Sequence, residues 1–214
     1  WTSTNSGNTW TKHINKTLKF STVDTDLFIA PSYGYIKQQT VNEISDITNE
    51  EKQWKAIKSA QNGSITIAAE IFGQLWVKKG TDTQFTAATI SVETVETVKL
   101  FQTVETVKLF PWSDIDCSIN GNIIAAVSWK YIFISKNNAA TFDLIPGCTI
   151  DNLFAGFSSV KISNDNNYIF VSTFGDKVFK INVDDYSSIN SNKWYSNTQN
   201  NKNWRSITSS ADGT

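Results

Sequence analysis

The sequence predicts an all-β repeat fold in one domain spanning residues 1–214: a β-propeller of four-stranded antiparallel blades, or a fragment of one. Three observations support this prediction. A segment that opens with Trp recurs along the chain, and each copy contains a hairpin signal. The period of roughly 40 to 50 residues is that of one four-stranded blade.

The repeat aligns without gaps over three segments. Each has Trp, two residues, Ile, four residues and then Asn-Gly or Asp-Gly, in the ranges 54–63, 112–121 and 204–213. An apolar, β-branched run follows the Gly, as in 65–69 and 123–127. Asn-Gly between two such runs predicts a tight hairpin turn in which both residues take positive φ. Each segment is therefore expected to fold as strand, turn, strand.

A third strand is expected after an aromatic residue that usually precedes or neighbours Gly, as in 72–77 and 129–134. Two weaker copies run through 18–34 and 160–175, which brings the visible repeats to five. The expected repeats are approximately 15–53, 54–111, 112–156, 157–203, and 204–214 together with 1–14. The two chain ends leave two alternatives open: a five-bladed ring closed by both termini, or a piece of a six- to ten-bladed array.

One interval is longer than the others because it contains a tandem duplication. The eight residues TVETVKLF occur at 94–101 and again at 103–110. We interpret the duplication as a lengthened connection between repeats, with an error in the sequence as the alternative.

Two segments resemble the Asp box, S-x-D-x-G-x-T-W, also called the BNR repeat, which is found in propellers of the sialidase and sortilin superfamily. The matching residues are Ser3, Asn5, Gly7, Thr9 and Trp10 in the first copy and Ser135, Asn137, Thr141 and Phe142 in the second. Both copies carry Asn at the Asp position, and the second has Ala139 at the Gly position.

This resemblance implies a fold more than an activity. In the family the box is a structural turn between the third and fourth strands of a blade, away from the active site. A short polar side chain caps backbone N–H groups, Gly permits positive φ, and the aromatic residue packs between blades.

Catalysis and metal binding are poorly supported by the residue inventory. Sialidase activity needs a cluster of three Arg, and the chain has only Arg205. The single His, His13, excludes a His-rich metal site. The acidic pairs within 24–26 and 184–185 lack the further oxygen ligands of a calcium loop. We expect no catalytic residue, cofactor or metal.

Paired carboxylates are the one remaining route to glycoside hydrolysis, since two acids from different blades suffice. Asp114, Asp116, Glu70 and Asp176 are candidates, and nothing in the sequence selects among them. The two cysteines, Cys117 and Cys148, are expected to be buried free thiols, with one disulfide between them as the alternative.

Four aromatic residues, Tyr33, Phe72, Trp129 and Phe174, are each expected between the second and third strands of a repeat. In a propeller these positions share one face around the axis. The rings then either pack between blades or form a ligand-binding face for a sugar or a partner side chain.

Charge narrows the choice of partners. The net charge is −1 and the lysines are scattered, so neither nucleic-acid binding nor membrane insertion is expected. We predict a non-catalytic module that binds a protein or a glycan, as part of a multi-subunit assembly on a cell or particle surface or outside the cell. The alternative is a fragment of a glycoside-acting enzyme whose catalytic residues lie outside this segment.

Overall fold

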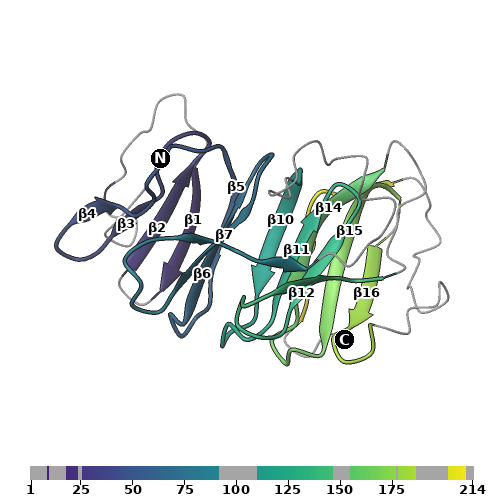
Figure 1. Ribbon diagram of the computed structural model, residues 1–214. Coiled ribbons are helices and arrows are strands. Elements are labelled where there is room, and N and C mark those ends of the chain that lie inside the picture. Colours follow the sequence, from purple (N-terminus) through teal and green to yellow (C-terminus); the bar gives the residue numbers. More distant parts are fainter. Residues whose placement is uncertain are drawn as a thin grey trace.

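A computed structural model describes residues 9, 18–23, 26–91, 110–146, 155–176, 178–186 and 202–210. Within these ranges the secondary structure is entirely β, with no helix. No stretch of the described chain therefore forms an apolar helix long enough to cross a bilayer. The strands form four separate sheets that follow one another in sequence order (Figure 1).

The first two sheets each contain four antiparallel strands in sequence order. The first sheet comprises β1 (Leu18–Val23), β2 (Asp26–Pro31), β3 (Lys37–Gln39) and β4 (Ile44–Asp46). The second comprises β5 (Trp54–Ser59), β6 (Ile65–Glu70), β7 (Leu75–Lys79) and β8 (Thr86–Ala87).

The third and fourth sheets extend the series. The third comprises β10 (Trp112–Cys117), β11 (Ile124–Ser128), β12 (Ile132–Ser135) and β13 (Phe142–Leu144), with β9 (Ile90–Ser91) added at its edge. The fourth comprises β14 (Gly156–Ile162), β15 (Tyr168–Asp176), β16 (Val178–Asn182) and the short β17 (Lys202–Asn203).

The structure confirms an all-β chain built from four-stranded antiparallel sheets and adds one feature that was not predicted. Strand β9, from the segment after the second sheet, pairs parallel to β13, with Ile90 opposite Phe142. The Phe142 N–H donates to the Thr89 carbonyl at 2.9 Å. Because β13 is otherwise an outer edge strand, β9 satisfies backbone groups that would face solvent unpaired.

The first hairpins form where they were predicted, but their turn type is different. Gly63 and Gly121 have φ of 71° and 75°, whereas Asn62 and Asn120 do not have positive φ. Gly63 N–H donates to the Ala60 carbonyl at 3.0 Å, so the turn spans four residues and ends on the left-handed Gly. The prediction of positive φ at both turn residues is therefore wrong. The Asn side chain instead accepts a bond from a backbone N–H beyond the Gly, which stabilises the turn.

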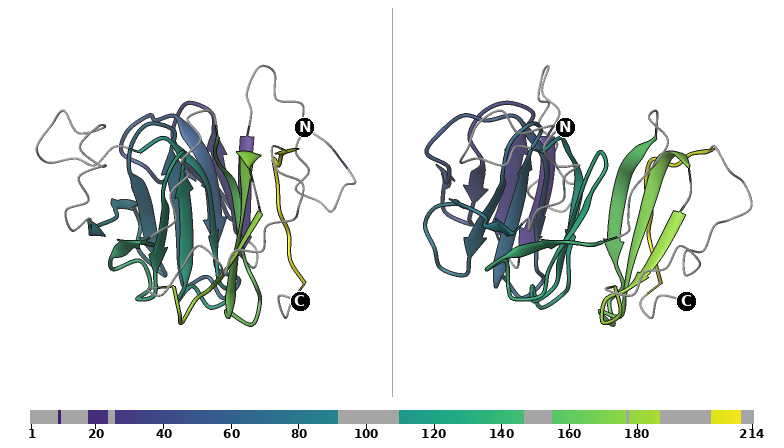
Figure 2. Two further views of the ribbon diagram at one scale, coloured as in Figure 1. Left: turned by 90° about the vertical axis from the view of Figure 1, so that its right-hand side faces the viewer. Right: turned by 45° about the vertical axis from the view of Figure 1, so that its right-hand side comes forward.

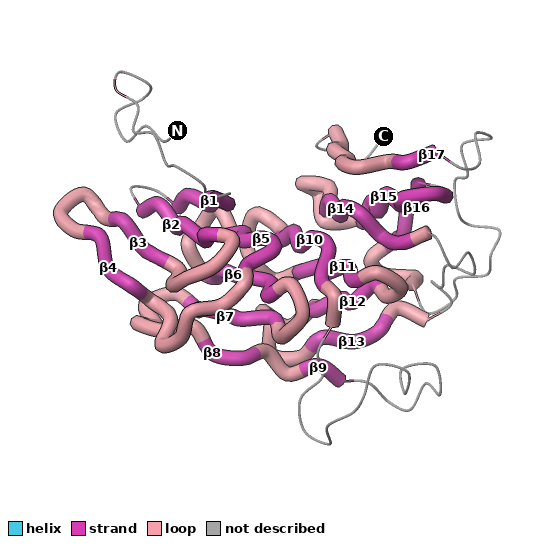
Figure 3. Tube along the Cα trace, turned by 90° about the horizontal axis from the view of Figure 1, so that it is seen from above, coloured by secondary structure: helices cyan, strands magenta, loops and turns pink. Residues whose placement is uncertain are grey.

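The sheets pack through their first strands. β1 contacts β5, β5 contacts β10, and β10 contacts β14. Seen from above, these four strands lie next to one another and the later strands of each sheet lie farther out (Figure 3). Separate apolar clusters fill the spaces between the first and second, second and third, and third and fourth sheets.

Residues 202–210 lie beside the fourth sheet, as the yellow segment in Figure 2 shows. Asn203 pairs with Phe174 of β15, and the Trp204 N–H donates to the Thr173 carbonyl at 3.1 Å. The Ser158 hydroxyl of β14 donates to the Trp204 carbonyl at 2.6 Å. The last described residues are thus held by both β14 and β15.

Candidate functional site

Four aromatic residues lie where the second strand of each sheet passes to the third. Tyr33 follows β2, Phe72 follows β6 and Trp129 follows β11, whereas Phe174 lies within β15 near its end. Tyr33, Phe72 and Trp129 expose 57%, 71% and 40% of their surface. This exposure leaves the three rings accessible to a ligand rather than enclosed between sheets. We call Tyr33, Phe72, Trp129 and Phe174 the aromatic end.

Backbone hydrogen bonds fix these turns at one end of the molecule. Gly34 and Lys52 exchange two bonds, of 3.0 and 3.2 Å, and Gly73 and Phe110 exchange two of 3.3 and 3.1 Å. Lys52 and Phe110 lie two residues before the starts of β5 and β10. Each turn therefore lies beside the start of the following sheet's first strand.

The leading Trp of the repeat reinforces this junction. The indole N–H of Trp54 donates to the Gly34 carbonyl at 2.8 Å, and that of Trp112 donates to the Gly73 carbonyl at 2.9 Å. Both indoles are buried. The same side chain thus fills the space between two sheets and satisfies the carbonyl beside an exposed aromatic residue.

Trp129 is supported by the next sheet in a different way. Its carbonyl accepts the Phe157 N–H at 3.0 Å. A Cβ atom at Gly156 would lie 2.6 Å from the Trp129 ring, a distance that side chains do not adopt. Gly156 therefore allows the indole to rest on the backbone of β14 while much of the ring stays exposed.

Phe174 differs from the other three residues because β15 continues through its position. Its ring is half-buried, and the Arg205 guanidinium lies 5.7 Å from the ring centroid. Arg205 itself is exposed.

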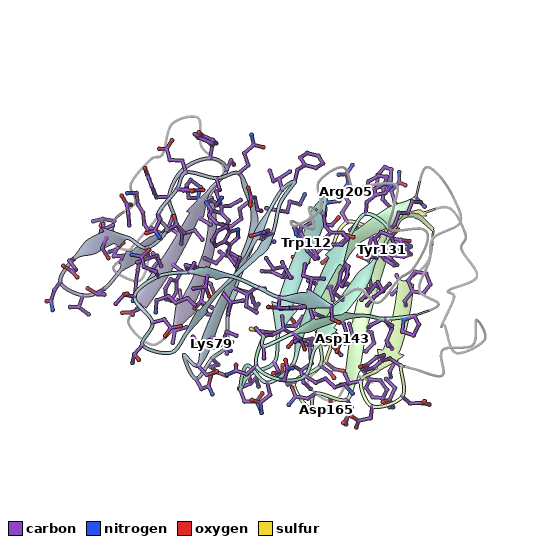
Figure 4. The ribbon with its side chains drawn as sticks, in the orientation of Figure 1. Lys79, Trp112, Tyr131, Asp143, Asp165 and Arg205 are labelled. Atoms are coloured by element: carbon purple, nitrogen blue, oxygen red, sulfur yellow. The ribbon has the colours of Figure 1, made fainter. Side chains whose placement is uncertain are left out.

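Buried aromatic rings lie beneath the aromatic end. The Phe110 ring is 5.2 Å from that of Trp112 and 4.9 Å from that of Phe133, between centroids. Tyr131 joins the same cluster. In Figure 4 Trp112, Tyr131 and Arg205 lie in the upper part of the molecule, whereas Asp165 lies at the opposite end.

The segment Ser135–Phe142 connects β12 to β13 through a network of side-chain hydrogen bonds. Asn137 Oδ1 accepts the Thr141 N–H at 3.0 Å, and its Nδ2 donates to the Thr141 hydroxyl at 2.9 Å. The Ser135 hydroxyl accepts the Ala139 N–H at 3.1 Å. Ala139 has φ of 56°, and Phe142 is fully buried between the second and third sheets.

Several predicted residues lie outside the described part of the chain. Of the first Asp-box-like segment, only Thr9 is described, and it is exposed. The others outside are Ser3, Asn5, Gly7, Trp10, His13, Asp24 and Cys148.

Asp114, a candidate acid, is used to join two sheets. Its carboxylate accepts the Ser159 hydroxyl at 2.7 Å and the Val160 N–H at 3.1 Å, both from β14, and the Ile115 N–H at 2.9 Å. Burial raises the pKa of Asp114, and these hydrogen bonds partly oppose that rise. The group caps the free edge of β14 rather than facing a substrate.

Asp116 has the same structural use and is more deeply buried, with 3% of its side chain exposed. One oxygen accepts the Ile162 N–H at 2.9 Å and lies 3.0 Å from the Lys161 ammonium. The other lies 3.2 Å from the Lys58 ammonium. Both carboxylate oxygens of Asp116 are therefore engaged by residues of β5 and β14.

Glu70 and Asp184, two further acids named above, each have a partner within the protein. Glu70 accepts the Trp76 indole N–H at 3.3 Å, and Asp184 forms an exposed ion pair with Lys136 at 3.6 Å. Asp176 ends β15, and its side chain is outside the described set. In the described ranges no three His, Cys, Asp or Glu side chains are placed to hold a metal ion.

Cys117 is a buried free thiol. Burial, with a smaller contribution from the neighbouring Asp116, raises the pKa of Cys117 to about 12. The thiolate that a nucleophile requires is therefore disfavoured at neutral pH.

One charged set was not predicted, because the repeat was defined by its aromatic, Ile and Gly positions and not by its charged positions. Lys58, Asp116 and Lys161 occupy the same position, four residues after the leading aromatic residue of their repeats. Reading that position across the repeats gives Lys, Asp, Lys, an alternation that suggests ion pairing between neighbouring sheets.

No protein-family model matches the chain, and no curated protein sequence matches it. Among solved structures, it is similar to the computationally designed Ika8 protein, with a TM-score of 0.55 and 11% identity over 78% of this chain and 46% of that chain. It is also similar to the computationally designed Ika4 protein, with a TM-score of 0.53 and 9% identity over 80% of this chain and 94% of that chain. The chain thus spans less than half of the Ika8 chain. At these identities the likeness concerns the fold alone.

Proposed function

We propose that this chain is a non-catalytic binding module of β-propeller architecture, whose four sheets are successive blades. Two observations support the architecture. The sheets follow one another in sequence order, and their first strands are neighbours while the outer strands diverge (Figure 3). Such an arrangement leaves the connections between strands at two ends, where ligands meet a propeller.

The observation that carries the binding function is the exposure of Tyr33, Phe72 and Trp129 at equivalent turns of three successive sheets. Large aromatic residues exposed in a row leave considerable apolar area in water, a feature typical of interaction sites. Flat rings held by a rigid backbone lose little conformational entropy when a ligand stacks on them. The ligand is a protein surface or a glycan.

The turn between β12 and β13 supports kinship with Asp-box propellers. Asn137 caps backbone and side-chain groups of the turn, and the following aromatic Phe142 is buried between sheets. These are the roles that the resemblance assigns to the Asp and Trp of the box. The turn lies on the connection from the third to the fourth strand, away from the aromatic end.

The candidate acids favour binding over catalysis. Asp116 is buried and Asp114 is half-buried, and both accept backbone hydrogen bonds from β14. A glycosidase pair needs one acid free to protonate a leaving group and another free to act as nucleophile or base. We propose that the module belongs to an assembly on a cell or particle surface or outside the cell, as the sequence-based expectation has it.

A glycan-array screen that compares the wild-type chain with the site variant Trp129→Ala tests this proposal. The expected result is binding of a defined set of glycans by the wild type and loss of that binding in Trp129→Ala. Absence of glycan binding by the wild type would rule out the lectin form. Equal binding by both proteins would rule out the aromatic end as the site.

A further inference from the structure

A cavity of about 340 Å³ lies at the end of the molecule opposite the aromatic end. The first strand of every sheet contributes to its wall, through Ser21 of β1, Lys58 of β5, Cys117 of β10 and Lys161 of β14. The hairpin turns that follow β5, β10 and β14 complete it. The cavity is thus formed where four sheets meet.

Charge distinguishes this cavity from an ordinary surface depression. The charged residues that line it are two lysines, and no carboxylate is in its lining. Asp116 lies beneath them, 3.2 Å from the Lys58 ammonium and 3.0 Å from that of Lys161. The two ammonium groups share this one carboxylate, which lies beneath them rather than in the lining of the cavity.

Both ammonium groups keep hydrogen-bonding capacity toward the cavity. An ammonium has three donors, and the ion pair with Asp116 uses one from each lysine. The side chains of Lys58 and Lys161 are 41% and 27% exposed, so they are reachable from solvent while Asp116 is not. Asp116 holds the two ammonium groups near each other, which lowers the entropic cost of binding one anion with both.

We propose that this cavity binds an oxyanion, a carboxylate or phosphate group, between Lys58 and Lys161. The hydroxyl of Ser21 supplies a further donor in the lining. A cation is disfavoured here because both charged groups facing the cavity are ammonium groups. The high pKa of the Cys117 thiol, about 12, makes the site one for binding rather than for thiolate chemistry. This site is independent of the aromatic end.

Isothermal titration calorimetry at low ionic strength tests the proposal with three probes: inorganic phosphate, citrate and a short poly-Glu peptide. The first two represent free small anions, and the third represents an acidic segment of a protein. We expect at least one probe to bind at a single site, with affinity falling as salt is added. Failure of all three to bind the wild type would overturn the proposal.

Variants locate the site. Lys58→Met and Lys161→Met each remove one ammonium group and leave Asp116 paired with the other, and each should weaken binding about tenfold or more. Lys55→Met is the matched control because Lys55 is exposed on the same strand but does not line the cavity. Thermal unfolding of each variant checks that it is folded.

The outcomes separate the possible explanations. Equal loss in Lys55→Met would indicate attraction by surface charge in general and would overturn the site. Wild-type affinity for the anion in both Lys58→Met and Lys161→Met would also overturn the proposed site. Trp129→Ala should bind the anion with wild-type affinity. Failure of the anion site can therefore be distinguished from failure of the proposal that the aromatic end binds a ligand.

Discussion

Trp112 illustrates how single residues join the sheets. Its indole fills the space between the second and third sheets, and its N–H donates to the Gly73 carbonyl beside the exposed Phe72. Trp54 makes the equivalent bond to Gly34. The sequence showed the leading Trp and the aromatic-Gly turn as separate features. The contact between the leading Trp and the aromatic-Gly turn could not be predicted, because it joins two neighbouring repeats. The periodicity describes only the order of residues within one repeat.

Trp112→Phe should reduce the free energy of unfolding by about 1 to 3 kcal/mol, because it removes a buried hydrogen bond and some apolar volume. Urea unfolding followed by circular dichroism measures this change. Trp76→Phe is the control, since Trp76 is only half-buried and its bond to Glu70 is longer, at 3.3 Å. A larger loss in Trp76→Phe would contradict the role given to the leading Trp.

Asp114 predicts a pH dependence of stability. Burial raises the pKa of Asp114 in the folded state above its unfolded value. Its favourable contribution is therefore complete at acid pH, below the unfolded pKa, and is lost as pH rises through the folded pKa. The difference in unfolding free energy between the wild type and Asp114→Asn should fall as pH rises from about 4 toward 7. A difference that rises with pH would contradict this account.

At the level of secondary-structure elements, hairpin turns of neighbouring sheets contact one another. The hairpin turn after β5 packs against the turn after β10: Ser64 Oγ donates to the Asn120 carbonyl at 2.9 Å, and Asn62 Nδ2 donates to the same carbonyl at 3.3 Å. The sequence predicted both hairpins correctly. It could not predict the four-residue turn, because the same Asn-Gly pair suits two turn types, one with positive φ at both residues and one with positive φ at the Gly alone.

Gly121→Ala should destabilise the protein by about 2 kcal/mol or more. Gly121 has φ of 75°, and a Cβ there would lie 2.5 Å from Ser64 Oγ and 2.7 Å from Ile65 Cγ2. Gly80→Ala is the matched control, since Gly80 has φ of 41° with nothing within 4 Å of its Cβ position. That control should lose only the roughly 1 to 2 kcal/mol of left-handed backbone strain. Equal losses would show that the two turns do not pack tightly.

Ala139→Gly should increase the free energy of unfolding by less than about 1 kcal/mol, because relief of the left-handed backbone strain at φ of 56° is partly offset by loss of a buried methyl group. Ala140→Gly is the control: Ala140 is not at positive φ, so that change should lower stability slightly. Chemical denaturation of both variants gives the comparison. A loss of stability in Ala139→Gly would argue against the box-like turn.

At the scale of the whole molecule, the described residues form a series of four sheets with apolar clusters between neighbours. The predicted repeat starts at 54, 112 and 157 lie at or within one residue of the starts of β5, β10 and β14. Strand β9 was not predicted because two residues carry no periodic signal, and its partner β13 belongs to the next repeat. Likewise, exposure of the turn aromatics depends on how far neighbouring sheets extend, which no local pattern encodes.

The central claim is that the exposed aromatic residues act together as a binding surface. The most direct test is glycan-array binding by the triple variant Tyr33→Ala, Phe72→Ala, Trp129→Ala beside the wild type and Ile44→Ala. Ile44 is an exposed apolar residue of β4, away from these turns. We predict that the triple variant loses binding while keeping the unfolding midpoint of the wild type, and that Ile44→Ala binds normally. Undiminished binding by the triple variant would contradict the account.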